Sequence, residues 1–174
     1  MKKLAFAVLL IFACCLNSCN NSATQGGMTE KAKKNLATAQ AVVKMFESGD
    51  YSKTGDYIAA DAVDHSGEGG RDVKGVDSIR AEFEQMSKMM SNFKNEVVKE
   101  IADDDYSFQW LKETSTMKQD AMGMKAGSTN TFNAIEVSKF NADSKISDHW
   151  SFISSNDMMK MMPQMPMDTA MKKK

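Results

Sequence analysis

Tyr106-Ser107-Phe108-Gln109-Trp110 is the stretch from which the fold class is read, because aromatic residues alternate in it with polar ones. A period of two is typical of a β-strand that buries one face. From Phe93 onward this period predicts four long strands, separated by turn-forming residues such as Asp103-Asp104-Asp105. We place these strands at about 93–102, 106–117, 129–140 and 145–154. The second half of the chain is therefore predicted to form an antiparallel meander.

The first half has helical spacing instead. Thr29 can cap a helix that Gly49 ends, with apolar residues between them at intervals of three and four. A short second helix is predicted at about 51–60, with Asp64-His65 following it before a glycine-rich loop, and a third helix follows Gly75. Three helices followed by a meander predict an α+β fold: a cone of N-terminal helices packed on a curved antiparallel sheet.

An export signal precedes these helices. Lys2 and Lys3 come before 13 mostly apolar residues, a run too short to span a bilayer and of the right length for a secretory signal. Leu16-Asn17-Ser18-Cys19 resembles a bacterial lipobox, in which the cysteine is lipidated and becomes the mature N-terminus. We predict that residues 1–18 are removed and that diacylglyceryl and N-acyl (palmitate) chains on Cys19 anchor the protein in the bacterial cell envelope. Cys14 is a weaker lipidation candidate, and a plain secretory signal is the alternative.

Composition limits what the mature chain can do. Loss of residues 1–18 leaves 20 basic and 23 acidic residues, a net charge of −3, which argues against nucleic-acid binding. All three cysteines lie in or at the end of the signal, so the mature domain has no internal disulfide and no cysteine metal site. We divide the chain into the signal (1–18), a flexible tether (19–28), one domain (29–157) and a tail rich in Met and Lys (158–174) that we predict to be disordered.

Few residues can carry chemistry. His65 titrates near neutral pH and is the first candidate for acid–base catalysis, with Asp64 placed to orient it. Asp148 shares strand parity with Trp150, so we expect both to face the pocket, and His149 to lie on the opposite face. Desolvation among aromatic residues would raise the pKa of Asp148. The alternatives are a loop histidine bonded to backbone and a carboxylate paired at the rim.

The predicted pocket is lined by Tyr57, Asp64, His65, Trp110, Asp148 and Trp150. The two tryptophans could form a wall for a flat or apolar ligand, although plain core packing explains them equally well. The methionines of the tail could bind Cu(I) as soft ligands, but no Cys or His accompanies them there. We predict neither a metal nor a cofactor.

Four segments in order resemble the SnoaL-like branch of the nuclear transport factor 2-like superfamily: Tyr57 to His65, Lys74 to Ile79, Met122 to Ala126 and Lys145 to Trp150. The resemblance covers about residues 35–162. It implies a cone of three helices on a curved sheet with a pocket at one end, as in polyketide cyclases, where a carboxylate moves protons during ring closure. The chain departs from the family at Ser151 and Ser154, where relatives often carry an acid, and at Lys125, which replaces a loop proline.

Three functions are consistent with these features. The first is a lipid-anchored envelope protein whose pocket binds a small, partly apolar molecule. The second is a proton-transfer enzyme, an isomerase or a cyclase, that uses His65 and Asp148. The third is an envelope interaction module whose sheet face forms a homodimer.

Overall fold

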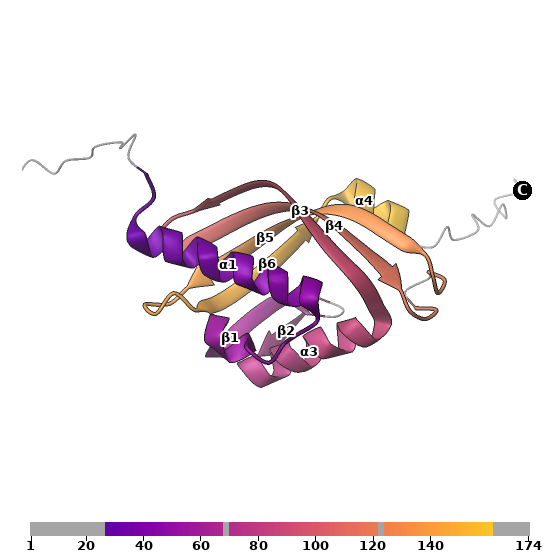
Figure 1. Ribbon diagram of the computed structural model, residues 1–174, viewed down its shortest axis with the longest axis horizontal. Helices are drawn as coiled ribbons and strands as arrows, with labels where there is room; N and C mark the ends of the chain where they lie inside the picture. Colours follow the sequence, from indigo (N-terminus) through magenta and orange to yellow (C-terminus); the bar gives the residue numbers. More distant parts are fainter. Residues whose placement is uncertain (1–26, 68–69, 122–123, 162–174) are drawn as a thin grey trace, which may run out of the picture.

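The structure is a computed structural model that describes residues 27–67, 70–121 and 124–161. Its elements follow the order shown in Figure 1: α1 (Glu30–Ser48), α2 (Thr54–Tyr57), β1 (Ile58–Gly67), β2 (Arg71–Lys74), α3 (Val76–Met89), β3 (Met90–Ala102), β4 (Tyr106–Met117), β5 (Thr129–Phe140), β6 (Ile146–Ile153) and α4 (Ser155–Met161). The predicted α+β class is confirmed. No helix within these ranges is long and apolar enough to span a membrane. The predicted signal, Cys19 and most of the tether and tail lie outside them.

The ends of α1 form as the sequence predicts. The Thr29 hydroxyl accepts a hydrogen bond from the backbone N–H of Ala32, which satisfies one free donor of the first turn. Gly49 adopts a φ of 69°, and its N–H donates to the carbonyl of Met45. A residue with a Cβ is disfavoured in this left-handed conformation, so the glycine ends the helix.

The predicted helix at 51–60 is wrong over its second half. Only Thr54–Tyr57 is helical, and β1 begins at Ile58 and runs through the Asp64-His65 pair. Ala59, Ala60 and Ala62 favour a helix locally, but pairing with β6 supplies backbone hydrogen bonds that a four-residue helix cannot. The sheet therefore has six strands rather than the four of the predicted meander.

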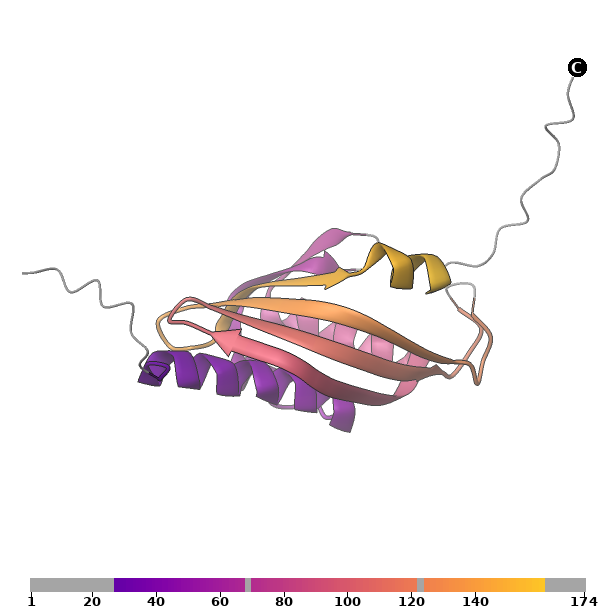
Figure 2. The same ribbon diagram turned by 90° about the horizontal axis from the view of Figure 1, so that it is seen from above.

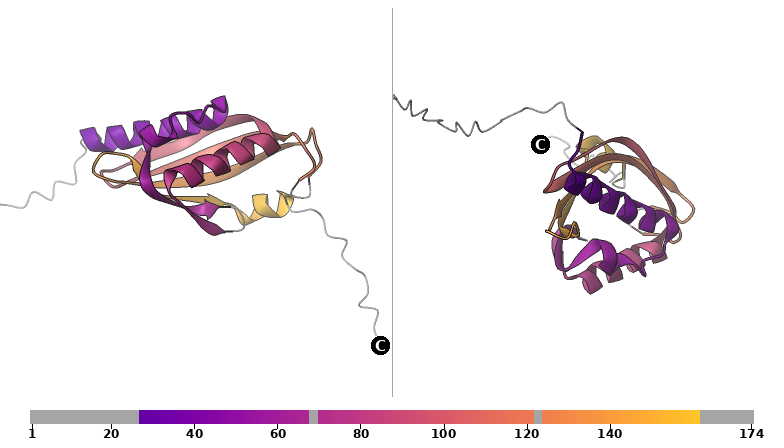
Figure 3. Two further views of the ribbon diagram at one scale, coloured as in Figure 1. Left: turned by 90° about the horizontal axis from the view of Figure 1, so that it is seen from below. Right: turned by 60° about the vertical axis from the view of Figure 1, so that its left-hand side comes forward.

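The strand order of the sheet is β2-β1-β6-β5-β4-β3. All neighbours are antiparallel except β1 and β6, which run parallel. The sheet is strongly curved, with α1 and α3 on its concave side (Figure 3). Figure 2 shows α1 on one side of the strands and α4 beyond the end of β6 on the other. We call the face that packs on α1 and α3 the inner face, and the opposite face the outer face.

The core lies between α1, α3 and the inner face near β1. It contains Ala39, Met45, Tyr51, Ile58, Ala59, Ala62, Val73, Ile79, Phe83, Phe140 and Ile146. Phe46 packs against this core, and its ring centroid lies 4.5 Å from that of Phe83. The core thus fixes β1 and β6 against the helices, and these two strands supply part of the site described next.

Candidate functional site

Four ionisable side chains from four strands gather on the inner face: Asp64, Glu113, Glu136 and His149, which we call the inner cluster. The Nδ1 atom of His149 lies 3.2 Å from Asp64 Oδ1, and its Nε2 atom lies 2.8 Å from Glu136 Oε2. The Ser151 hydroxyl donates to the other Glu136 oxygen at 2.7 Å. The imidazole is therefore held between two carboxylates from β1 and β5.

A bulge in β6 turns His149 inward. Phe140 pairs with Ile146, whereas the preceding Lys139 pairs with Asp148, so Ser147 is one residue extra. An extra residue reverses the side-chain alternation beyond it. Ile146 is buried in the core, and after the bulge the inward positions are His149 and Ser151 instead of Asp148 and Trp150.

On β1, no such reversal is needed to bring Asp64 to the site. Asp64 lies two residues beyond Ala62, which is in the core, so both side chains point to the inner face. Asp64 is also aligned with His149 across the parallel pair of strands. The backbone N–H of Ser66 donates to Asp64 Oδ1 at 2.8 Å and fixes the carboxylate further.

The two carboxylates make His149 a permanent cation near neutral pH. Burial alone would lower the pKa of His149, but hydrogen bonds to Asp64 and Glu136, together with their charges, outweigh burial and raise this pKa to about 10. For Asp64, burial acts to raise the pKa, yet the bond to His149 and its positive charge hold the pKa below its usual value. The His149 side chain retains 27% exposure, so solvent reaches the cluster.

Glu113 is the acid of the cluster that can change protonation. Burial raises the pKa of its carboxyl to about 8, and the negative charge of Glu136 and a hydrogen bond to it add to the rise. The positive charge of His149 acts in the opposite direction. Glu113 is therefore mostly protonated at pH 7, close enough to its pKa to donate or accept a proton.

A hollow of about 260 Å³ lies between α1 and β3, next to the strand that carries Glu113. Its walls are Gln40, Val43, Lys44, Glu47, Asn95, Val97 and Gln109. Asn95 pairs directly with Glu113 across β3 and β4, and Gln109 pairs with Glu136 across β4 and β5. Directly opposed residues of an antiparallel pair share a face and lie about 5 Å apart at Cβ. Two lining residues of the hollow, Asn95 and Gln109, are thus the cross-strand neighbours of the two glutamates of the inner cluster, which do not line the hollow themselves.

The structure does not bring the predicted catalytic pair to this site. His65 and Asp148 lie on the outer face, where His65 Nε2 is 3.6 Å from Asp148 Oδ1 and Nδ1 is 2.9 Å from Asp72. Lys139 lies 3.6 Å from the other Asp148 oxygen. Asp148 is paired with a lysine, as in the alternative prediction, but this pair lies on the outer face rather than at a pocket rim. Asp64 is bonded to His149 rather than to His65.

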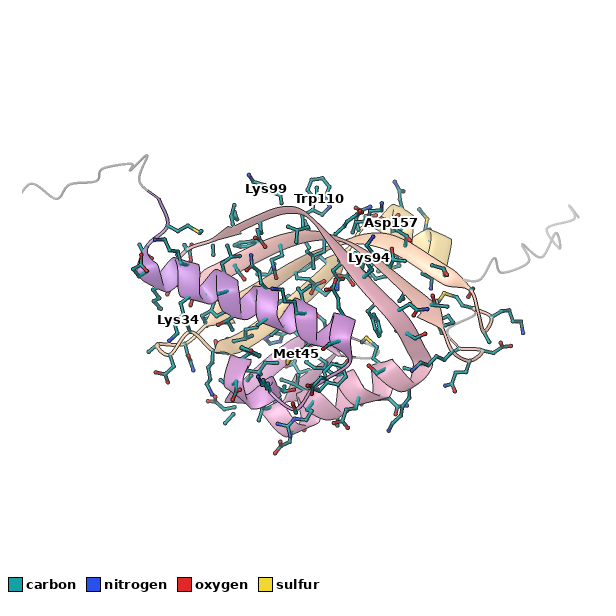
Figure 4. All side chains as sticks on the ribbon, in the orientation of Figure 1. Lys34, Met45, Lys94, Lys99, Trp110 and Asp157 are labelled. Carbon is teal, nitrogen blue, oxygen red and sulfur yellow. The ribbon has the colours of Figure 1, made fainter. Side chains whose placement is uncertain are left out.

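The predicted aromatic wall is also on the outer face. Trp110 is 47% exposed, and Figure 4 shows its side chain pointing away from α1, whereas its strand neighbours Gln109 and Leu111 are buried on the inner face. Trp150 stacks on His65 with ring centroids 4.8 Å apart. Tyr57 packs against the core. Of the six predicted pocket residues, Asp64 is the one placed in the inner cluster.

Sequence reasoning missed Glu113, Glu136 and the inward direction of His149. The sequence prediction places Trp110 in the pocket, but several inner positions of β4 and β5 are small or polar: Ser107, Gln109, Ala134 and Ser138 are all buried. Small residues let α1 approach the sheet closely. The signal available in the sequence was Glu113, an acid that shares parity with Leu111 and Met117.

Within residues 27–67, 70–121 and 124–161, no group of three or more His, Cys, Asp or Glu side chains is arranged to hold a metal ion. In the inner cluster, both ring nitrogens of His149 are already bonded to carboxylates. The arrangement suits proton transfer by a carboxyl group whose neighbour is fixed by an imidazolium.

Solved structures share the fold. An LEH-like epoxide hydrolase of M. tuberculosis superposes with a TM-score of 0.62 at 12% identity, over 76% of this chain and 91% of its own. A SnoaL-like polyketide cyclase of Agrobacterium tumefaciens gives 0.61 at 15% identity, over 72% and 95%. TsrD of Streptomyces laurentii gives 0.63 at 10% identity, over 74% and 94%. Comparison with curated proteins gives no significant match.

The family comparison is more specific than these superpositions. The family model described as SnoaL-like polyketide cyclase matches residues 36–165, which is most of the chain. The matched range includes the four strands that carry the inner cluster. The resemblance read from the four sequence segments is thereby confirmed, and this chain belongs to the SnoaL-like polyketide cyclase family.

Proposed function

We propose that this protein binds a small, partly apolar molecule on the inner face and transfers protons to and from it through Glu113. The observation that carries the proposal is the buried carboxyl of Glu113, which stays protonated beside the Glu136–His149–Asp64 chain. Carboxyl groups with strongly shifted pKa values cluster at functional sites, which makes Glu113 a candidate for chemistry. Catalytic relatives in the family support the same reading.

The proposed substrate is a carbonyl compound with an acidic C–H bond next to the carbonyl. The ionised form of Glu113 removes that proton, and the electron pair of the C–H bond moves to the carbonyl oxygen to give an enolate. The protonated Glu113 then returns the proton to the same or a conjugated carbon. Because the pKa of Glu113 is about 8, roughly a tenth of the protein carries the base form at pH 7.

The rest of the inner cluster, Glu136 above all, keeps Glu113 in its protonated form before substrate binds. Glu136 accepts hydrogen bonds from His149 and Ser151, which fix its carboxylate beside Glu113. This negative charge keeps the proton on Glu113 until substrate enters. In the proposal, Val43 and Val97 of the hollow between α1 and β3 provide the apolar part of the binding surface, and Gln40 and Asn95 provide polar groups.

Deuterium exchange tests the proposal without knowledge of the natural substrate. A panel of β-keto esters and aryl ketones is incubated with the full-length protein in D₂O, and loss of the C–H signal next to the carbonyl is followed by proton NMR. Catalysed exchange of at least one panel member is expected, and Glu113→Gln should slow it by about 100-fold or more. Glu96→Gln is the matched control, because Glu96 is an exposed strand glutamate that pairs with Lys112 on the outer face.

Two results would contradict the proposal. If no panel member exchanges faster than in buffer, while native mass spectrometry finds a retained small molecule, the protein binds without catalysis. If exchange is catalysed but Glu113→Gln matches the parent, the proton passes through another group.

We further propose that the domain is anchored to a membrane of the bacterial envelope through lipid on Cys19. The lipobox-like sequence Leu16-Asn17-Ser18-Cys19 supports this, as does the apolar run before it. Residues 20–27 are small and polar and offer no other anchor.

Cys19→Ser is therefore expected to move the protein from the membrane fraction to the soluble fraction. Cys14→Ser, the control at the weaker candidate, should leave it membrane-bound. Both fractions are compared by immunoblot, and the N-terminal peptide is weighed by mass spectrometry. A parent peptide without added lipid mass, in a protein that stays with the membrane after Cys19→Ser, would rule the anchor out.

A further inference from the structure

Three methionines gather at one end of the inner face: Met90, Met117 and Met124, which we call the thioether cluster. They come from the start of β3, the end of β4 and the loop between β4 and β5, which meet where α3 runs into β3 (Figure 1). Met117 is 2% exposed, and the other two side chains are half-buried. These are not the tail methionines for which Cu(I) binding was considered from the sequence.

Strand pairing places the first two methionines side by side. Met90 is directly opposite Met117 in the antiparallel pair of β3 and β4. Opposed residues share a face and lie about 5 Å apart at Cβ. The N–H of Lys118 donates to the carbonyl of Met89 at 2.8 Å, which fixes the junction of α3 and β3 against the end of β4. The two side chains therefore leave the backbone at neighbouring points of the inner face.

A second pair of opposed residues brings in the third methionine. Ser115 and Asn130 face each other across β4 and β5. The Ser115 hydroxyl donates to Met90 Sδ at 3.5 Å. The Asn130 amide Nδ2 donates to Met124 Sδ at 2.6 Å. Two sulfur atoms are thus held beside one cross-strand pair, and Met117 lies two residues from Ser115 on the same strand face.

This set of side chains suits a soft metal ion. Thioether sulfur is a soft ligand that selects Cu(I), whereas carboxylate and carbonyl oxygens suit Mg²⁺ and Ca²⁺. A thioether sulfur has two lone pairs, so one that accepts a hydrogen bond keeps the other for a metal. A methionine side chain has three rotatable bonds, which allow three sulfur atoms to converge on one ion without movement of the backbone.

We propose that the thioether cluster binds one Cu(I) ion through the sulfur atoms of Met90, Met117 and Met124. Ser115 and Asn130 orient two of the ligands through the hydrogen bonds that they already donate. None of the three ligands is anionic, so a divalent ion entering the site would lose its hydration without compensation by opposite charge. The site goes beyond the proton transfer proposed for Glu113 and does not depend on it, because the ligands are other residues.

Titration with Ag⁺ tests this inference, because Ag⁺ is a soft d¹⁰ ion like Cu(I) and is stable in air. The full-length protein, in detergent and chloride-free buffer, is labelled with ¹³C at the methionine methyl groups and followed by NMR. Single Met→Leu variants assign the methyl peaks. The peaks of Met90, Met117 and Met124 should shift together and saturate at a 1:1 ratio of Ag⁺ to protein.

Met117→Leu and Met124→Leu each remove one ligand with little change of volume. Each should weaken Ag⁺ binding at this site, measured by calorimetric titration, by about 10-fold or more. Met45→Leu is the matched control, because Met45 is also a buried methionine but lies in the core beside α1 and α3. It should bind Ag⁺ as the parent does, and circular dichroism confirms that each variant is folded.

Two results would overturn the inference. If Ag⁺ shifts only methyl peaks of the tail, or none at all, the three methionines serve packing alone. If Met117→Leu and Met124→Leu both bind Ag⁺ as tightly as Met45→Leu does, the ion is held by other residues.

Discussion

Replacement of His149 by glutamine is expected to lower the free energy of unfolding by about 3–5 kcal/mol at pH 7. Glutamine keeps much of the size of histidine and can donate a hydrogen bond, but it removes the positive charge. Asp64 and Glu136 would then face each other across the inner cluster without a cation between them. Denaturant unfolding of the full-length protein measures the loss.

His65→Gln is the matched control, because the only other histidine of the chain also lies between two carboxylates, but on the outer face. Its loss should stay below about 1 kcal/mol, because its partners Asp72 and Asp148 are 48% and 26% exposed, against 13% and 16% for Asp64 and Glu136, and solvent screens the pair. Equal losses for the two variants would mean that the inner cluster is no more desolvated than the surface.

The pH dependence of stability gives a second test of the same residue. The folded pKa of His149, about 10, is raised above its unfolded value near 6.5, so its stabilising contribution is complete below about pH 6.5. This contribution declines as the pH rises from there and is lost above about pH 10. The parent should therefore lose stability over that range, whereas His149→Gln should lack the part due to histidine.

Glu113→Gln is expected to act in the opposite direction and stabilise the protein by about 2–4 kcal/mol at pH 8. The folded pKa of Glu113, about 8, is raised above its unfolded value near 4.5, so folding takes up a proton between these values. Stability due to this residue thus falls as the pH rises from about 4.5 to about 8. Glutamine is a neutral mimic of the protonated acid and removes that dependence.

Unfolding curves at pH 5, 7 and 8 measure the effect. The gain should be smallest at pH 5, which is only about half a pH unit above the unfolded pKa of Glu113, and largest at pH 8. Glu96→Gln should leave the curves nearly unchanged at every pH. A gain that does not depend on pH would trace the effect to packing rather than to the buried carboxyl.

The two effects of Glu113→Gln, greater stability and slower proton exchange, would identify a residue retained for chemistry. Sites that bury an acid for catalysis are less stable than the neutral variant. If Glu113→Gln stabilised the fold without slowing proton exchange, catalysis would not explain why the chain buries this acid.

Much of the fold could be predicted from the sequence because helix ends and strand alternation depend on neighbouring residues alone. Thr29 and Gly49 bound α1 through their own side-chain and backbone preferences, and Gly75 precedes α3 at the predicted place. The long strands follow from alternation that is visible without the partner strand. The segment 58–64 could not be read in this way, since its strand conformation depends on β6, more than 80 residues later.

The site was harder to predict for the same reason. The bulge at Ser147 is defined by the pairing of β6 with β5, and it alone decides whether Asp148 or His149 points inward. On β4, the outer face carries the larger apolar side chains, so hydrophobicity pointed to Trp110 although Glu113 is the inner residue. Asp64 was selected as an orienting carboxylate, but for the wrong histidine.

The position of β6 has a consequence for how the chain folds. It is the last strand in the sequence, yet it lies between β1 and β5 and joins the N-terminal part of the sheet to the meander. Contacts of such long sequence separation form late, because the loop between them must close first. Until residues 146–153 insert, Asp64 remains in water without its imidazolium, so the charged site and the complete sheet must form in the same final step.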